Sequence, residues 1–259
     1  MKRATWTFLA LSSMLLVGCF ENRGKPQDAT PITSLAALSA TNRVEVRRLY
    51  LRGAAAVKEG DLANLPNLKE LDLSEQGIAA LPRDVFALSS LEHLYLARNR
   101  FVSLPAELVS LPALTYLNLD GNKIAEIPEA LGGAGKLRWL RLNENELTAL
   151  PNALSGLKNL QRIYLRRNKL GTVPEVLKDW SLLEDVVLDQ NPIKEVPAWL
   201  LQLPKLRAVS FAGCAISKLP ADLKPWRRLD SLVLSGCPIP AEEMKRIRAE
   251  LGDDVAVTF

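Results

Sequence analysis

Large aliphatic residues recur along this chain at an interval of 23 residues. Within one copy, counted from Leu68, apolar residues stand at positions one, four and six, and polar residues stand at positions three and five. Alternation of this kind buries one side of a strand, so each copy predicts a short strand with one apolar side. The regular copies begin at Leu68, Leu91, Leu114, Leu137, Leu160, Leu183, Leu206 and Leu229, and a degenerate first copy begins at Val46.

A single copy of this length cannot cover its own apolar side, but stacked copies can. Stacking places the strands side by side as a parallel sheet over one continuous core. The fifteenth position of the copies is proline, which donates no backbone hydrogen bond and suits a turn into a short helical or irregular segment. These prolines are Pro82, Pro105, Pro128, Pro151, Pro174, Pro197 and Pro220.

The ninth position of five successive copies is asparagine. A side-chain amide can both donate to and accept from backbone groups where the chain leaves a strand. We therefore expect these residues to form a buried structural ladder and assign them no catalytic role. They are Asn99, Asn122, Asn145, Asn168 and Asn191.

The combined pattern, LxxLxLxxN followed by LxxLP, resembles the leucine-rich-repeat family over residues 46–240. The resemblance implies an α/β repeat solenoid, a horseshoe with a parallel sheet on its concave face and a helical or irregular convex face. It also implies that the protein binds another macromolecule, without saying which, because this fold supports many ligands.

The first residues of the chain are typical of a bacterial export signal. Lys2 and Arg3 precede a run of uncharged, mostly apolar residues, 4–17, which is shorter than a membrane-spanning helix. The last residues before and including Cys19, Leu-Val-Gly-Cys, resemble the lipobox of bacterial lipoproteins, which implies cleavage before Cys19 and acylation of that residue. The alternative is an ordinary signal peptide or short anchor in which the cysteine occurs by chance.

These features predict three segments. Residues 1–18 form the signal, residues 19–33 form a polar tether, and residues 34–259 form the repeat domain. Lipid chains on Cys19 would hold the protein to a membrane of the cell envelope. By family analogy Phe20, in place of Asp, favours the outer membrane over the inner one if the organism has both.

Both ends of an open solenoid need covering, because they expose core and strand edges. Residues 33–40 predict a short N-terminal cap helix. Residues 241–259 predict the C-terminal cap, in which Met244, Ile247 and Leu251 share one helical face and residues 255–259 form a closing strand.

Composition excludes several functions. The net charge of +4, less the two charges of Lys2 and Arg3, is too small for nucleic-acid binding, which needs a concentrated basic face. His93 is the only histidine, and the chain contains no HExxH, phosphate-binding glycine loop or CxxC. We expect no enzyme activity, no cofactor and no metal site. Residues 132–135 (GGAG) predict a loosened convex loop.

Two cysteines, Cys214 and Cys237, replace asparagine at the ninth position of the last two copies. They are interpreted either as two small buried thiols or as a disulfide between neighbouring copies. The second alternative requires an oxidising compartment and a spacing within bridging distance.

Polar positions three and five of the copies should point away from the core, into solvent on the concave face. All four tyrosines of the protein take these positions, with one tryptophan, the histidine and several arginines. Tyrosine, tryptophan and arginine are enriched in the energetic centres of protein interfaces. The residues predicted to contact a partner are His93, Tyr95, Tyr116, Trp139, Arg141, Arg162, Tyr164 and Arg166.

We therefore expect a monomeric recognition module that binds a protein through its concave face. A glycan or peptidoglycan ligand is one alternative. The other is a passive structural or assembly component of the envelope, in which the aromatic residues only pair across strands.

Overall fold

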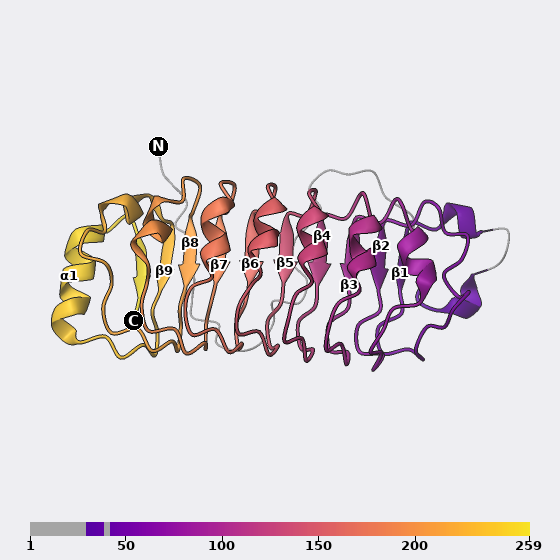
Figure 1. Ribbon diagram of the computed structural model, residues 1–259, viewed down its shortest axis with the longest axis horizontal. Coiled ribbons are helices and arrows are strands. Elements are labelled where there is room, and N and C mark those ends of the chain that lie inside the picture. The colour runs from indigo at the N-terminus through magenta and orange to yellow at the C-terminus, as the bar shows by residue number, and fades with distance from the viewer. Residues whose placement is uncertain (1–29, 39–41) are drawn as a thin grey trace.

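The computed structural model describes residues 30–38 and 42–259. Within them, ten parallel strands form one sheet, in which each strand pairs with the next along the chain (Figure 1). The fold class predicted from the repeat is thus confirmed. The strands are β1 (Arg48–Tyr50), β2 (Glu70–Asp72), β3 (His93–Tyr95), β4 (Tyr116–Asn118), β5 (Trp139–Arg141), β6 (Arg162–Tyr164), β7 (Asp185–Val187), β8 (Ala208–Ser210), β9 (Ser231–Val233) and β10 (Ala256–Thr258).

The orientation of the strand side chains follows the alternation in the sequence. In β5, for example, Leu140 is buried, whereas Trp139 and Arg141 lie on the other side and are half-buried. The register keeps equivalent positions beside one another, so that Trp139 lies opposite Tyr116 and Arg162. Positions three and five therefore form two continuous rows along the concave face.

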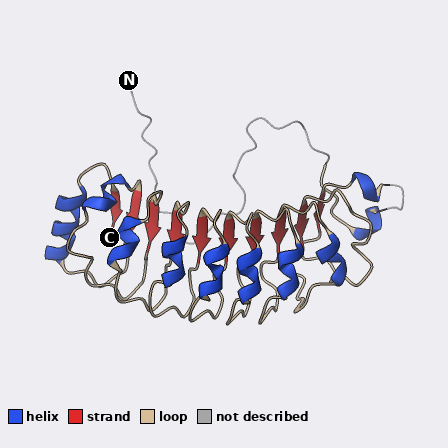
Figure 2. Cartoon of the chain, turned by 45° about the horizontal axis from the view of Figure 1, so that its top comes forward, coloured by secondary structure: helices blue, strands red, loops and turns tan. Residues whose placement is uncertain are grey.

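Short 3-10 helices form the convex face, opposite the sheet (Figure 2). In six repeats the predicted proline immediately precedes the helix, where its fixed φ suits the entry. Pro220 differs, because the last of these helices begins four residues later and contains Pro225 in its first turn. The helices are η3 (Arg83–Ala87), η4 (Ala106–Ser110), η5 (Glu129–Gly133), η6 (Asn152–Gly156), η7 (Glu175–Asp179), η8 (Ala198–Gln202) and η9 (Lys224–Arg228).

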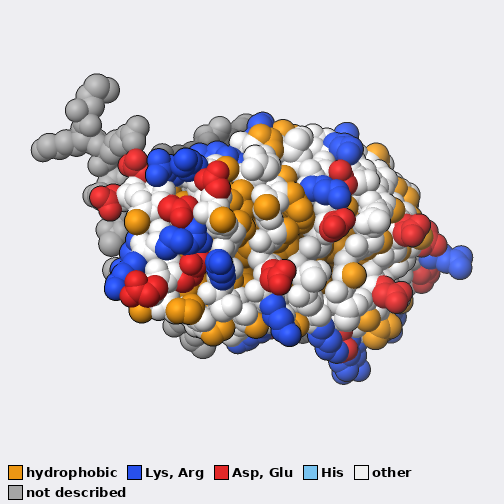
Figure 3. Space-filling view, turned by 60° about the vertical axis from the view of Figure 1, so that its left-hand side comes forward, with side chains coloured by type: hydrophobic (Ala, Val, Ile, Leu, Met, Phe, Trp, Pro, Cys, Tyr) orange, Lys and Arg blue, Asp and Glu red, His pale blue; other side chains and the backbone are white. Residues whose placement is uncertain are grey.

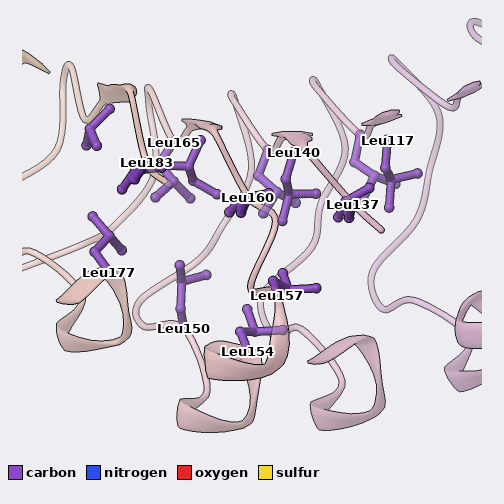
Figure 4. Close-up of a cluster of buried hydrophobic side chains, with 14 of the residues drawn as sticks. Leu117, Leu137, Leu140, Leu150, Leu154, Leu157, Leu160, Leu165, Leu177 and Leu183 are labelled. Atoms are coloured by element: carbon purple, nitrogen blue, oxygen red, sulfur yellow. The ribbon is translucent and has the colours of Figure 1, made fainter. Parts of the chain in front are cut away.

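The core lies between the sheet and these helices. Figure 4 shows leucines from the strand side, such as Leu140 and Leu160, above leucines from the convex side, such as Leu154 and Leu157. Trp180 is fully buried among them, and its indole N–H donates to the carbonyl of Leu154 at 2.9 Å.

The predicted asparagine ladder is present and buried. The Nδ2 of Asn145 donates to the carbonyls of Leu119 in the preceding repeat (3.0 Å) and Leu142 in its own (3.1 Å). Its Oδ1 accepts from the backbone N–H of Ile124 at 3.0 Å. Each ladder residue thus joins two repeats, and all five are at most 7% exposed.

The N-terminal end differs from the prediction. Instead of one cap helix over residues 33–40, the described residues contain two 3-10 helices, η1 (Leu35–Ala37) and η2 (Arg43–Glu45). Ile32, which falls within the predicted tether, forms a parallel bridge with Leu49 and extends the sheet. This pairing could not be predicted, because one isolated apolar residue after a polar segment has no periodicity.

The C-terminal end matches the prediction. The helix α1 (Ala241–Leu251) buries Ile247 and Leu251 against the last repeat, with Met244 packed beside them, and β10 pairs with β9. No helix within residues 30–38 and 42–259 has the length and apolarity that crossing a bilayer requires.

Candidate binding surface on the concave sheet

Seven of the eight residues predicted to contact a partner lie on four adjacent strands of the concave face. Arg166 is the exception: it follows β6 in a loop, and its Nε donates to Oε1 of Gln190 at 3.1 Å. We call the other seven the concave cluster. They are His93 and Tyr95 on β3, Tyr116 on β4, Trp139 and Arg141 on β5, and Arg162 and Tyr164 on β6.

The aromatic side chains of the concave cluster contact one another. The ring centroid of Tyr116 lies 5.0 Å from that of Tyr95, 5.7 Å from that of His93 and 5.7 Å from that of Trp139. The contacts with His93 and Trp139 are edge-to-face, the arrangement that the charge distribution of aromatic rings favours. These side chains point away from the core, as expected, and they are half-buried against each other rather than fully exposed to solvent.

The two arginines of the concave cluster stack on its rings and pair with carboxylates. The guanidinium of Arg162 lies 4.8 Å from the centroid of Trp139, and that of Arg141 lies 5.0 Å from the centroid of Tyr164. Arg141 also forms a salt bridge of 2.6 Å with Asp120. Arg162 forms one of 3.0 Å with Asp185.

The residue that sequence reasoning missed is Asp120. It follows β4 by two residues and holds Arg141 from the neighbouring strand, and its second oxygen accepts from the backbone N–H of Asn143 at 2.8 Å. The sequence does contain a signal for this pair: Asp120 stands at the seventh position of one repeat, and Arg141 stands at the fifth position of the next repeat. It was missed because only positions three and five were considered.

A hydrogen-bonded group borders the concave cluster on the side of the first repeats. The carboxylate of Glu70 accepts from the hydroxyl of Tyr50 and lies 3.7 Å from Nδ1 of His93. The neighbouring imidazole of His93 and the hydrogen bond from Tyr50 hold the pKa of Glu70 below its usual range. Burial is the main cause that raises the pKa of Tyr50 to about 12.

Toward the last repeats, the side chains on the concave face are small and uncharged. Strands β8 and β9 present Ala208, Ser210, Ser231 and Val233 at the same positions. Elsewhere on the surface in view in Figure 3, acidic and basic side chains are interspersed. In the two concave rows, the aromatic side chains are thus contiguous on β3–β6, and Tyr50 on β1 is the other aromatic residue of these rows.

In the structure Cys214 is a buried free thiol and Cys237 is a half-buried one. Cys214 donates to the carbonyl of Leu188 at 3.2 Å, and Cys237 donates to that of Phe211 at 3.1 Å. Each thus makes one of the inter-repeat bonds that asparagine makes elsewhere. Burial raises the pKa of Cys214 to about 11, which disfavours the reactive thiolate.

Asp189, in the loop after β7, allows a pH-dependent test of whether the turn after each strand requires a charged carboxylate. Its Oδ1 accepts from the backbone N–H of Ala212 at 3.0 Å and from the hydroxyl of Ser210, and burial raises its pKa. Asn143 occupies the equivalent place two repeats earlier and accepts from the N–H of Arg166 at 2.8 Å. An uncharged amide oxygen is therefore sufficient for this turn.

We expect Asp189→Asn to raise the Tm at neutral pH by a few degrees. Because the pKa of Asp189 is higher in the folded state than in the unfolded state, the charged carboxylate lowers the free energy of unfolding at pH values above the unfolded-state pKa. Protonation of the carboxyl at lower pH removes this loss of stability. The advantage of the variant should therefore disappear as the pH is lowered to about 3, where the carboxyl is protonated in both states. Thermal unfolding across this pH range is the measurement, with the exposed Asp179→Asn as control. A lower Tm for the variant at neutral pH would contradict the prediction.

Comparison with known families agrees with this geometry. A family model described as "Leucine rich repeat" matches residues 66–124 and 128–170. With its stacked parallel strands and asparagine ladder, the chain has the fold of a leucine-rich-repeat solenoid. No curated protein matches it.

Two solved structures show which proteins share the fold. An internalin (inlF) from Listeria monocytogenes is 22% identical, with a TM-score of 0.64, and the match covers 88% of this chain and 73% of the internalin. A plant peptide hormone receptor, RGFR1 in complex with RGF2, is 22% identical, with a TM-score of 0.63; the match covers 82% of this chain and 37% of the receptor. At this level of identity the likeness shows the fold alone.

Proposed function

We propose that this protein is a recognition module that binds another protein through the concave cluster, while lipid chains on Cys19 hold it in the bacterial cell envelope. One observation carries the binding proposal: aromatic and arginine side chains are concentrated on four adjacent strands and arranged in advance by contacts within the chain. Preorganised aromatic side chains lose little conformational freedom on binding and contribute large contact areas. The fold is commonly a protein-interaction module, and we assign it no enzyme activity.

The ring geometry favours a protein over a glycan. A sugar stacks on an exposed ring face, but one face of Trp139 lies under Arg162 and one face of Tyr164 lies under Arg141. Tyr116 meets its neighbours edge-to-face rather than forming a flat platform. Side chains of a protein partner can pack between tilted rings, whereas the broad face of a sugar ring needs a parallel surface.

A passive structural component of the envelope is the second candidate. It is favoured by the same contacts, because rings that pair across strands stabilise the sheet whether or not anything binds. The two candidates differ in what a change at the concave cluster does to binding, so that measurement separates them.

We expect Tyr116→Ala and Trp139→Ala each to weaken partner binding by about 2 kcal/mol or more, roughly 30-fold. Both should also lower the Tm, since each ring contacts its neighbours. Arg141 and Arg162 are already paired with carboxylates, so the affinity should depend only weakly on salt.

The measurement is capture of envelope proteins with the purified domain, followed by titration of the captured partner. The exposed convex variants Arg83→Ala and Lys178→Ala are controls that should bind as the wild type does. Wild-type affinity of the folded aromatic variants would favour the passive component instead.

Cys19 lies outside the described residues, so its role is tested independently. We expect Cys19→Ala to accumulate the unprocessed precursor or to release the mature protein into the soluble fraction, because acyl chains supply the membrane affinity. Fractionation and mass spectrometry of the N-terminus are the measurements. Normal processing with unchanged membrane association would contradict acylation of this residue.

A further inference from the structure

Two glycines on the convex face, Gly132 and Gly156, allow the neighbouring helices η5 and η6 to touch through their backbones, and a third, Gly133, faces a side chain of η4. A methyl group on Gly132 of η5 would lie 2.1 Å from the carbonyl oxygen of Ala153 in η6, and one on Gly156 would lie 2.3 Å from the carbonyl oxygen of Gly132. One on Gly133 would lie 2.6 Å from Cγ2 of Val109. The sequence-based prediction of a loosened loop at residues 132–135 is therefore wrong: Gly132 and Gly133 belong to a helix that packs tightly on its neighbour.

This close approach is local to the middle of the solenoid. Among the convex helices, η5 and η6 pack most closely, followed by η4 and η5, whereas η3–η4, η7–η8 and η8–η9 pack less closely. The matching positions elsewhere carry larger residues. At the position of Gly132 these are Phe86, Val109, Ser155, Lys178, Leu201 and Lys224.

The sheet spacing does not change in the same way. Every pair of strands from β1 to β9 keeps the same parallel register, and hydrogen bonding fixes the distance between neighbouring strands at about 4.8 Å. The curvature of a solenoid follows from the rotation between repeats, which depends on how far apart the convex segments stand. Where the convex helices approach, the sheet must be flatter.

The closely packed convex helices lie behind the aromatic half of the concave cluster. Helices η4, η5 and η6 belong to the repeats that begin with β3, β4 and β5. Those strands carry His93, Tyr95, Tyr116 and Trp139. A tighter arc would move the tips of these rings toward one another, because they project toward the centre of curvature.

We propose that Gly132, Gly133 and Gly156 are positioning residues that flatten the sheet behind β3–β5 and thereby set the spacing of the rings of the concave cluster. The consequence for recognition rests on the function proposed above. A flattened row of rings fits a broad protein surface that contacts several repeats. A strongly curved sheet would instead fit a narrow segment of a partner that lies inside the curve. The glycines contact no partner themselves.

Crystal structures of Gly132→Ala and Gly156→Ala test the curvature directly. The added methyl should push η5 and η6 apart, increase the bend between β4 and β5, and bring the centroids of Tyr116 and Trp139 closer than 5.7 Å. Gly135→Ala and Gly171→Ala are matched controls, since a methyl at either site meets nothing within 4 Å. Separated helices with an unchanged bend and unchanged ring spacing would overturn the proposal.

A second variant covers the case in which these substitutions prevent folding. The methyl of Gly133→Ala meets a side chain rather than the backbone, so Val109→Ala should relieve it. We expect Gly133→Ala to lower the Tm and shift the rings, and Gly133→Ala/Val109→Ala to restore both beyond the sum of the single effects. An absence of coupling between the two substitutions would contradict the steric argument.

The affinity for the captured partner separates this inference from the proposed function. Gly132→Ala, or Gly133→Ala if the former does not fold, should weaken binding about tenfold although no concave residue is altered. A changed bend with unchanged affinity would overturn the claim about partner shape and leave the proposed function standing. The proposed function would instead be contradicted if Tyr116→Ala bound the partner as the wild type does. That result would not depend on how the sheet bends in the glycine variants.

Discussion

Replacing Asn145 by alanine is expected to lower the free energy of unfolding by about 3–5 kcal/mol. The substitution leaves the backbone N–H of Ile124 and the carbonyls of Leu119 and Leu142 without their amide partner in the buried interior. Each such unsatisfied group costs about 1–3 kcal/mol, which is far more than the net gain from an average hydrogen bond. Urea unfolding followed by circular dichroism measures the effect.

The last two repeats supply a graded comparison. A thiol at this position makes one inter-repeat bond, as Cys214 does with Leu188, so Asn145→Cys should fall between the wild type and Asn145→Ala. The exposed Asn159 makes a single bond of 2.7 Å with the carbonyl of Gly135, and Asn159→Ala should cost less than about 1 kcal/mol. Equal stabilities for the alanine variants at 145 and 159 would show that the ladder does not stabilise the solenoid.

Removing Arg246 should detach the C-terminal cap from the last repeat. Its guanidinium donates to the carboxylates of Glu243 (2.8 Å) and Glu250 (2.7 Å), and to the carbonyls of Pro220 and Ala221, both at 3.1 Å. A planar fork that satisfies several acceptors cannot be replaced by a water molecule or by a single point charge.

We expect Arg246→Ala to cost about 2–3 kcal/mol and to increase hydrogen exchange in α1 and β9 before the central repeats. Arg246→Lys should recover only part of the loss, because an ammonium lacks the fork. The control is Lys245→Ala, which removes an exposed pair with Glu242 and should leave unfolding unchanged. Uniform destabilisation of all repeats would indicate that Arg246 does not act through the cap.

The periodicity of the sequence was sufficient to predict the fold. The alternation around Leu140 and its equivalents located every strand from β1 to β9, and the recurring asparagine located the ladder. These predictions succeeded because a solenoid contains mainly contacts between adjacent repeats, so one repeat determines the environment of the next.

The turn after each strand could not be predicted. The eighth position adopts a left-handed backbone in every regular repeat, and the residues there include Glu144 (φ 56°), Arg167 (φ 53°) and Gln190 (φ 54°). Only Gly121, Gly213 and Gly236 belong to the residue type that favours this conformation. The stacked neighbours impose the turn on the other residues, at a local cost that their own sequence does not reveal.

The spacing predicted which side chains share the concave face, but it predicted neither their contacts nor the role of Asp120. Spacing placed Tyr116 and Trp139 on one face, whereas the edge-to-face packing and the stacking of Arg162 depend on side-chain rotamers, which no sequence pattern encodes. The glycines of η5 and η6 were misinterpreted for a related reason. Glycine indicates flexibility when it is considered alone, and it indicates close contact only when its neighbour is known.

The bridge at Ile32 determines how the domain would respond to mechanical load. A pull on the chain from its N-terminal side reaches the sheet at two hydrogen bonds, from Ile32 N–H to Arg48 and from Tyr50 N–H to Ile32. When tension is applied to one edge of a parallel sheet, the strands separate one after another rather than all at once. Ile32 would therefore detach first, and β1 would follow. Tension applied from this side would therefore reach β3–β6 only after Ile32, β1 and β2 had separated from the sheet.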